Sequence, residues 1–196
     1  MKKAIAAIFA ESIAATQHFL HEHGEALSRA TEEVVRALKA GGKILLFGNG
    51  GSAADAQHIA AEFVNRYLIE RPPLPAIALT TDTSALTSIA NDYGVAELFA
   101  KQIRALGRAG DVAIAISTSG NSANVLRALE VCRELHIHTI GLTGGKGGAM
   151  AGMVDHLLCV SSTSVTPRIQ EAHILIGHVI CELADQMLFG AESGRR

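Results

Sequence analysis

Short apolar runs separated by longer amphipathic stretches dominate the chain from residue 43 onward. Five runs have strand length and little polar alternation, at 44–47, 76–79, 112–116, 139–142 and 156–160. Each is followed by a cluster of Gly, Ser or Thr and then by a stretch with helical spacing. Strands without a polar face that alternate with helices are typical of a parallel sheet buried on both faces. The pattern predicts a three-layer, doubly wound α/β domain with a five-stranded parallel sheet.

The first forty residues show helical spacing. Apolar residues spaced for one helical face occur at Ile5, Phe9, Ile13 and Leu20. Gly24 is the expected break, after which a second helix continues toward residue 40. We therefore expect one domain over 1–196, with N-terminal helices at 1–40 and an α/β core at 41–196. Two roles fit the helices equally well: packing on a partner subunit, or capping their own core.

Composition and charge exclude several classes of protein. The net charge is −2, there is no basic run, and only six Phe and two Tyr are available for stacking on bases. These values argue against a nucleic-acid binder. No segment resembles a signal peptide or reaches the length of about 20 apolar residues that a membrane span needs. Three dispersed cysteines, Cys132, Cys159 and Cys181, are expected to be reduced. We expect a cytoplasmic protein that binds neither nucleic acid nor membrane.

A glycine-rich turn, Gly48-Asn49-Gly50-Gly51-Ser52, follows the first strand and opens a helix. Glycines let the backbone approach an anion, and the free N–H groups of a helix N-terminus attract negative charge. The spacing is not the G-x-G-x-x-G of dinucleotide sites, and residues 141–147 do not form a phosphate-binding loop of the nucleotide triphosphatase type. The turn therefore indicates a phosphate site that serves neither ATP nor NAD.

Four hydroxyl side chains surround Gly120 after the third strand: Ser117, Thr118, Ser119 and Ser122. Capping of the next helix would explain one of them, because an N-cap needs a single Ser or Thr. Four hydroxyls together with backbone amides are suited to one phosphate group. A site of this kind, without Lys or Arg, fits a small phosphorylated metabolite.

Histidine and acidic side chains on two predicted helices form the second candidate site. His58 and Glu62 are four residues apart and project from one helical face. On the C-terminal helix, which Pro167 can start, Gln170 and His178 are eight residues apart and so differ by roughly 80° around the axis. His173 points elsewhere and is expected to be structural. From spacing alone, the His58–Glu62 pair is better explained as a helix-stabilising contact. Its place directly after the glycine-rich turn, and the second set on the C-terminal helix, favour a functional role.

Six segments together resemble the sugar isomerase (SIS) family, and within it the phosphoheptose isomerases. The segments are GNGGSAADAQHIAAEF at 48–63, RPPLPAIALTTD at 71–82, IANDYG at 89–94, ISTSGNS at 116–122, LTGGKGG at 142–148 and RIQEAHILIGH at 168–178. The resemblance implies a flavodoxin-like SIS fold and an aldose–ketose isomerase that converts sedoheptulose 7-phosphate to D-glycero-D-manno-heptose 7-phosphate. It also implies a homotetramer with active sites at subunit boundaries.

The same resemblance assigns roles to individual residues. It implies substrate contacts at Asn49, Gly50, Gly51, Ser52, Glu62, Asn91, Asp92, Ser117, Thr118, Ser119, Ser122 and Gln170. It implies one zinc ion per subunit on His58, Glu62, Gln170 and His178, and acid–base roles for Glu62 and His178. Arg66, one further turn along the helix of Glu62, is the expected helper.

The reaction requires removal of a proton beside a carbonyl and return of a proton to the neighbouring carbon. A carboxylate and an imidazole can divide this work through an enediol, and a zinc ion can stabilise the developing oxyanion. Gln is an uncommon zinc ligand, and a zinc-bound Glu is a poorer base than a free one. The division of roles between Glu62 and His178 is therefore open.

Three alternatives remain at this point. One relative in the family associates with the bacterial replication initiator without catalysis, and RALGRAGDVAIAIST at 104–118 resembles it. That relative lacks Glu and His at the positions of Glu62 and His178, so the residues here favour an isomerase. Another SIS enzyme, acting on a hexose or pentose phosphate or cleaving a lactyl ether, would carry other residues around the serine loop. In a purely structural reading, the glycine loop is only a tight turn.

Overall fold

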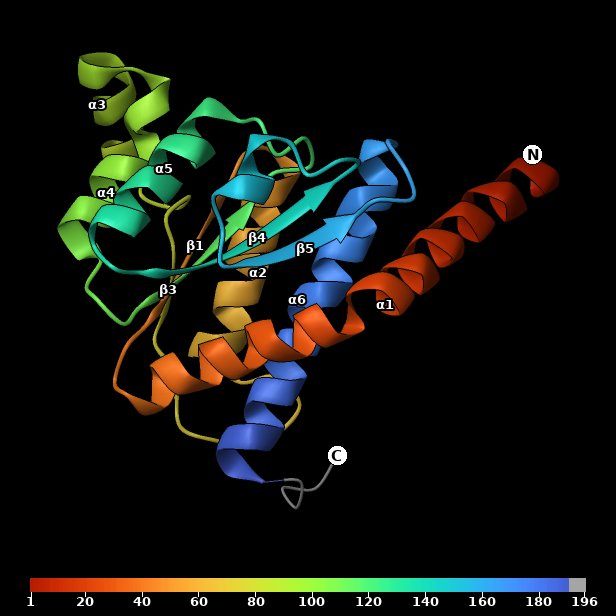
Figure 1. Cartoon of the computed structure of the whole chain (residues 1–196), viewed down its shortest axis with the longest axis horizontal. Helices are drawn as coiled ribbons and strands as arrows, with labels where there is room; N and C mark the ends of the chain where they lie inside the picture. The colour runs from red at the N-terminus through yellow and green to blue at the C-terminus, as the bar shows by residue number, and fades with distance from the viewer. Residues whose placement is uncertain (191–196) are drawn as a thin grey trace.

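A five-stranded parallel sheet forms the centre of the computed structural model, which describes residues 1–190 (Figure 1). Its strands are β1 (Ile44–Gly48), β2 (Ala76–Ala78), β3 (Val112–Ile116), β4 (His138–Gly144) and β5 (His156–Val160). Their order is β2-β1-β3-β4-β5, and every neighbouring pair is parallel. This is the flavodoxin-like order, with its switch point between β1 and β3. The predicted fold class is confirmed, and the last six residues of the predicted domain, 191–196, lie outside the described part.

Helices cover both faces of the sheet. One face packs against α1 (Lys2–Lys39), α2 (Gly51–Val64) and α6 (Thr166–Phe189). The other packs against α4 (Leu98–Leu106) and α5 (Ala123–Glu134), and α3 (Thr83–Tyr93) contacts α4 at the end of this layer. Two short 3₁₀ helices occupy Val95–Glu97 and Ala149–Gly152. All residues of β1 and β3 are buried, which explains why these strands have no polar alternation.

One continuous helix, α1, replaces the predicted helical pair. It runs through Gly24 without interruption, so the expected break there is wrong. A glycine inside a helix costs only about 1 kcal/mol relative to alanine, and the helix formers on either side together outweigh that cost. The C-terminal half of α1 packs on α6 and β5, whereas the N-terminal half extends beyond the sheet (Figure 1). Several apolar side chains of that half are exposed, and Phe9 and Leu20 are each 67% exposed.

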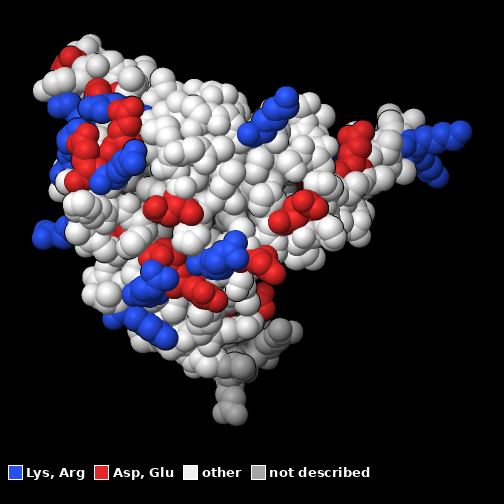
Figure 2. Space-filling view, viewed as in Figure 1, with Lys and Arg blue, Asp and Glu red and all other residues white. Residues whose placement is uncertain are grey.

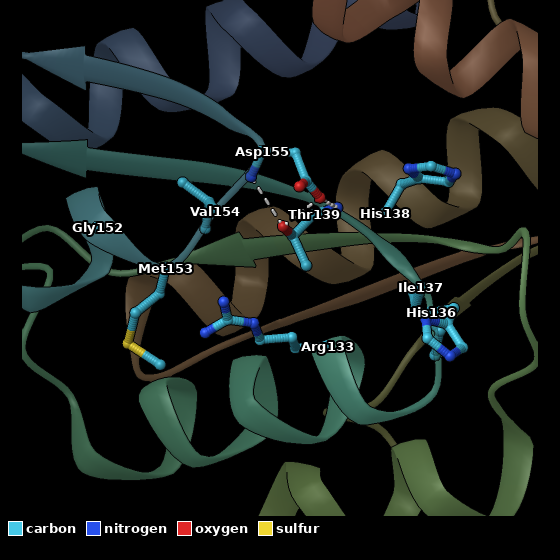
Figure 3. A pocket seen from close by; sticks show the side chains of 9 residues that line it. All are labelled: Arg133, His136, Ile137, His138, Thr139, Gly152, Met153, Val154 and Asp155. Carbon is cyan, nitrogen blue, oxygen red and sulfur yellow. Dashed lines mark hydrogen bonds between the residues drawn. The ribbon is translucent and has the colours of Figure 1, made fainter.

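Two carboxylates, the buried Asp111 and the more exposed Asp155, connect the amino ends of the strands. Asp111 accepts hydrogen bonds from the backbone N–H and the ammonium of Lys43, at 3.0 and 2.6 Å, and so joins β1 to β3. Asp155 accepts from the N–H and the hydroxyl of Thr139, both at 2.8 Å, and so joins β4 to β5 (Figure 3). A hollow of about 440 Å³ lies beside the contact between Asp155 and Thr139, and Arg133 is among the side chains that line it (Figure 3). It opens at the end of the sheet opposite the glycine and hydroxyl loops.

Helix α6 is the one helix in the described part that is long and apolar enough to cross a membrane by length and composition. Many of its apolar side chains, Ile176 and Ile180 among them, belong to the core between the sheet, α1 and α2, whereas Leu175 is 48% exposed. Asp185 is ion-paired within the same face. Packing inside the protein therefore accounts for the composition of α6.

Replacing Gly24 by alanine is expected to raise the free energy of unfolding by about 1 kcal/mol, because alanine is the better helix former. The added methyl group would lie 3.6 Å from Leu20 Cδ1, which is an ordinary contact. Denaturant unfolding measures the change. Gly41→Ala is the control: Gly41 has φ +82°, where a side chain is strained, so this variant should be less stable than the parent. Equal loss of stability in both variants would contradict the description of residue 24 as ordinary helix.

Candidate active site

The two phosphate-binding candidates lie side by side at the carboxyl ends of β1 and β3. These strands are neighbours in the sheet, so the loop 48–52 after β1 adjoins the loop 117–122 after β3. Asn49 and Asn124 join the loops by a reciprocal pair of side-chain hydrogen bonds, at 2.8 and 2.9 Å. The carboxamide of Asn49 is therefore engaged within the protein. Ligands of doubly wound folds bind at this switch point.

The glycine loop opens α2 as the sequence predicted. Gly50 has φ 57°, a backbone conformation that glycine adopts without strain, and α2 begins at the next residue. The hydroxyl of Ser52 is buried in the first turn. Because the first N–H groups of a helix have no partner within it, this end of α2 attracts an anion.

The hydroxyl loop does not act as a helix cap. Ser122 is the N-cap residue of α5, but its side chain makes no capping hydrogen bond. Its hydroxyl instead lies 2.9 Å from that of Ser117. Thr118 and Ser119 line an adjoining hollow of about 320 Å³. The capping explanation for even one of these hydroxyls is therefore wrong, because their hydrogen bonds stay within the loop, between Ser117 and Ser122 and from Asn121 N–H to Ser119.

The glycine-rich loop after β4 supports the hydroxyl loop from behind. A side chain at Gly148 would lie 2.5 Å from the carbonyl oxygen of Ser119, and Met150 N–H donates to the Gly120 carbonyl at 3.0 Å. These glycines allow two loops to touch backbone to backbone. Lys146, from the same loop, lines the hollow beside Thr118 and Ser119. One cationic side chain thus adjoins the hydroxyl loop, and the expectation that the phosphate is held without Lys or Arg stays a prediction.

Helices α2 and α6 run in the same direction side by side and bring three polar side chains together. His58 Nε2 lies 3.2 Å from Glu62 Oε1 on α2 and 3.0 Å from His178 Nε2 on α6. The three side chains offer ligand atoms that all lie within 4.8 Å of one another. We call this set the His–Glu–His group. The helices approach closely because Gly177, next to His178, leaves room for Ile59.

The donor atoms of the His–Glu–His group fit a zinc ion. Two imidazole nitrogens and a carboxylate oxygen are typical catalytic ligands of zinc. Bond lengths of about 2.0–2.1 Å in a tetrahedral site imply ligand atoms roughly 3.3 Å apart. The two distances to His58 Nε2, 3.0 and 3.2 Å, are close to that value. The side chain of Tyr67 stacks on His178 with ring centroids 5.6 Å apart and covers one side of the group.

Two residues with expected roles near this group occupy other positions. The carboxamide of Gln170 lies beside Gly51, at the start of α2. Arg66 lies beyond the end of α2 at Val64, not one turn further along it, and its guanidinium is 3.7 Å from Glu70. The expected position of Arg66 on the helix is wrong because α2 ends before it.

Asn91 and Asp92 are not brought to the His–Glu–His group within the described chain. Both lie exposed on α3, a helix without a buried residue, and Asn91 donates to Asp92 at 2.8 Å. Helix α3 contacts α4, in the layer on the other face of the sheet from α2 and α6 (Figure 1).

His173 has the structural role expected for it. It is fully buried, and its Nε2 lies 3.0 Å from the Thr143 carbonyl oxygen. Burial lowers the pKa of His173 to about 4, which keeps the ring neutral at pH 7.

Four residues that matter to the site escaped the sequence analysis: Asn124, Tyr67, Arg71 and Asp185. Asn124 pairs with Asn49, and Arg71 and Asp185 form a buried ion pair near the His–Glu–His group. The sequence pattern could have indicated Asp185, because an acidic residue seven positions after His178 falls on the same face of an apolar helix. Tyr67 and Arg71 lie between secondary-structure elements, where no periodicity marks them.

Comparisons with known proteins agree with this geometry. The model of the SIS domain family matches residues 8–144. The chain is 55% identical to phosphoheptose isomerase 2 of Campylobacter jejuni, over 93% of this chain and 91% of that protein. It is 54% identical to the phosphoheptose isomerase of Solidesulfovibrio magneticus, over 95% and 91%. The solved phosphoheptose isomerase of Neisseria gonorrhoeae superposes with a TM-score of 0.89 at 51% identity, over 94% and 98%.

Replacing Gly148 by alanine is expected to weaken binding of a phosphorylated sugar by about tenfold or more, which corresponds to about 1.4 kcal/mol. The methyl group would press on Ser119, and the backbone at residue 148 has φ +59°. Titration calorimetry measures the affinity. Gly152→Ala is the control in the same loop, because a side chain there meets nothing within 4 Å. If both variants bound with the affinity of the parent, the loop after β4 would have no part in shaping the hydroxyl loop.

Proposed function

Because the chain belongs to the SIS domain family and is an isomerase of the phosphoheptose type, we propose that it converts sedoheptulose 7-phosphate to D-glycero-D-manno-heptose 7-phosphate. In bacteria this product is an early precursor of activated heptose for surface polysaccharide. The observation that carries the proposal is that the glycine loop opens α2, with the hydroxyl loop beside it, and that the His–Glu–His group lies further along the same helix. A substrate anchored by its phosphate at one end can present its reacting carbons at the other.

The phosphate end uses neutral donors. We propose that Asn49, Gly50, Gly51 and Ser52 together with the hydroxyls of Ser117, Thr118, Ser119 and Ser122 hold the 7-phosphate. Hydroxyls and backbone N–H groups at the start of α2 fix its position, and the helix dipole favours its charge. Lys146 supplies a cation at the rim of this site.

Proton transfer at the other end falls to Glu62 and His178. In the proposed reaction, Glu62 takes a proton from C1 of the ketose while His178 donates one to the oxygen on C2, which gives the enediol. The second half returns a proton to C2 and removes one from the oxygen on C1, so the aldose forms with no net change in protons. Each group acts as acid in one half and base in the other. Tyr67, stacked on His178, limits the access of water from its side.

We propose that one zinc ion per subunit is held by His58, Glu62, Gln170 and His178. Three of these residues form the His–Glu–His group. Gln170 stands two turns before His178 on α6, and its carboxamide, which lies beside Gly51, would have to turn toward the group to complete the set. When bound, zinc supplies Lewis-acid polarisation of the sugar oxygens. The chain's own residues orient those oxygens and carry the protons.

A homotetramer with sites at subunit boundaries accounts for two unexplained surfaces, and we include it in the proposal. The N-terminal half of α1 exposes apolar side chains that include Phe9 and Ile13. Charged side chains gather instead over α4, α5 and the C-terminal half of α1 (Figure 2). Asn91 and Asp92 lie on α3, away from their own His–Glu–His group, and a partner subunit can receive them. A cytoplasmic location fits the buried free thiols of Cys132, Cys159 and Cys181.

Glu62→Gln and His178→Gln should each lower kcat for sedoheptulose 7-phosphate by at least about 100-fold, since acid–base groups contribute 10²–10⁴-fold. KM should change little, because the hydroxyl loop is intact. Turnover to the aldoheptose phosphate is measured with purified protein before chelation, after chelation and after zinc is restored. We expect activity to fall on chelation and to return with zinc.

Glu134→Gln serves as the matched control, because Glu134 is a half-exposed carboxylate on α5 in the opposite layer. Near-normal turnover in both site variants would refute the acid–base assignment. Activity indifferent to chelation would remove zinc from the proposal and leave the isomerase. A folded wild-type protein without any activity would favour the initiator-associating type.

Replacing Ile13 and Leu20 together by aspartate is expected to split the tetramer, because charges on the exposed face of α1 cannot be buried in a subunit contact. Light scattering of the purified protein measures the mass. Leu106→Asp is the control, since Leu106 is also an exposed apolar residue but lies at the end of α4, among charged side chains. A parent protein with the mass of a monomer would overturn the tetramer.

A further inference from the structure

A single buried arginine joins the two helices that carry the proposed acid–base pair. The side chain of Arg71 is 1% exposed, and it lies in the segment between α2 and β2. Its Nε donates to Asp185 Oδ1 of α6 at 2.8 Å. Its two terminal nitrogens donate to carbonyl oxygens at the end of α2, those of Glu62 at 2.8 Å and Phe63 at 2.7 Å. One rigid guanidinium therefore holds both helices.

The contacts with α2 explain where that helix ends. The last four carbonyls of a helix have no partner within it, and a cation near them is favoured by the helix dipole. Arg71 supplies both the donors and the charge, with further hydrogen bonds to the carbonyls of Pro72 and Asn65. The last turn of α2 is thus held by a side chain that comes from outside the helix. Glu62, whose side chain belongs to the His–Glu–His group, is in that turn.

The hydrogen bond from Arg71 to Asp185 holds α6 on the face that carries His178. Asp185 comes seven residues after His178, which is two turns along the same face. Its side chain is 5% exposed, so its position is fixed by packing. The link from Glu62 through Arg71 to Asp185 spans the gap between the helices beyond the point where Gly177 and Ile59 meet. The contact of Ile59 with Gly177 and the link through Arg71 lie at different positions along the helix axes. Together they fix both the distance between the helices and their register.

We infer that Arg71, with Asp185, is a positioning residue that sets the register between α2 and α6 so that Glu62 and His178 converge on one reacting centre. This inference rests on the roles proposed for Glu62 and His178. A buried ion pair by itself is weak evidence of a stabilising role, because desolvation offsets the attraction. Arg71, however, also donates hydrogen bonds to two backbone carbonyls in the turn of α2 that contains Glu62. Displacement of a reacting group by about 1 Å costs on the order of 100-fold in rate.

Arg71→Lys is the test, because lysine keeps the charge but cannot reach Glu62, Phe63 and Asp185 together with its single nitrogen. Zinc affinity is measured by competition with a coloured chelator, and kcat and KM are measured for sedoheptulose 7-phosphate. We expect zinc affinity and kcat each to fall by about 10–100-fold, the range typical of partners behind the ligands of a metal site. KM should stay within about threefold, because Arg71 contacts none of the phosphate-binding loops.

Asp111→Asn is the matched control. It breaks another ion pair between distant segments, the 2.6 Å contact with Lys43, at the amino ends of the strands. It should lower the melting temperature as Arg71→Lys does, but leave zinc affinity and kcat at parental values. Asp185→Asn is the milder second variant in case Arg71→Lys does not fold, because asparagine keeps an acceptor for Arg71 Nε. It should show the same losses in smaller degree.

A variant that loses melting temperature only, with zinc affinity and kcat of the folded protein unchanged, would overturn the inference and make Arg71 purely structural. The zinc measurement needs no turnover. It therefore tests Arg71 even if the proposed substrate is wrong, and the activity of the parent protein tests the substrate separately.

Discussion

The close parallel packing of α2 against α6 is the constraint on which the site depends. Gly177 has no side chain at the crossing, and Ile59 fills the space that a β-carbon would need. A larger residue at 177 would displace the Ile59 side chain or separate the helices, because protein interiors leave little spare volume. The separation would act directly on the neighbouring pair, in which His58 and His178 approach to 3.0 Å. A packing detail in the core thus sets the geometry of the polar group above it.

The sheet order supplies the other half of the site. Since β1 and β3 are neighbours but their connections go to opposite faces, α2 and α5 diverge from a common edge. The glycine and hydroxyl loops meet there, joined by Asn49 and Asn124. Helix α2 then leads away from this edge toward His58 and Glu62. The phosphate end and the polar group are consequently parts of one rigid element, so their separation is fixed by the length of α2.

Much of this arrangement was predictable from sequence because it depends on local signals. The strand runs without polar alternation indicated a sheet buried on both faces, and Pro167 marked the start of α6 correctly. The break at Gly24 failed because one glycine is a weak signal against helix formers on either side. The positions of Arg66, Arg71 and Tyr67 could not be predicted, because the end of α2 is determined by a guanidinium that arrives from the following segment. Contacts of that kind have no period in the sequence.

The two roles proposed for Glu62 are compatible for a geometric reason. A carboxylate has two oxygens, and Oε1 is the one that faces His58. The second oxygen is therefore left for a proton, so that a residue in contact with a metal can still exchange one with a substrate. The two oxygens are equivalent, so either can face His58 while the other exchanges the proton, and the division requires only that the carboxylate stays beside His58. The backbone of Glu62 is held at its carbonyl by Arg71, and the side chain is only 27% exposed. The held backbone and the limited exposure together keep the carboxylate beside His58, which makes the dual role of one side chain possible.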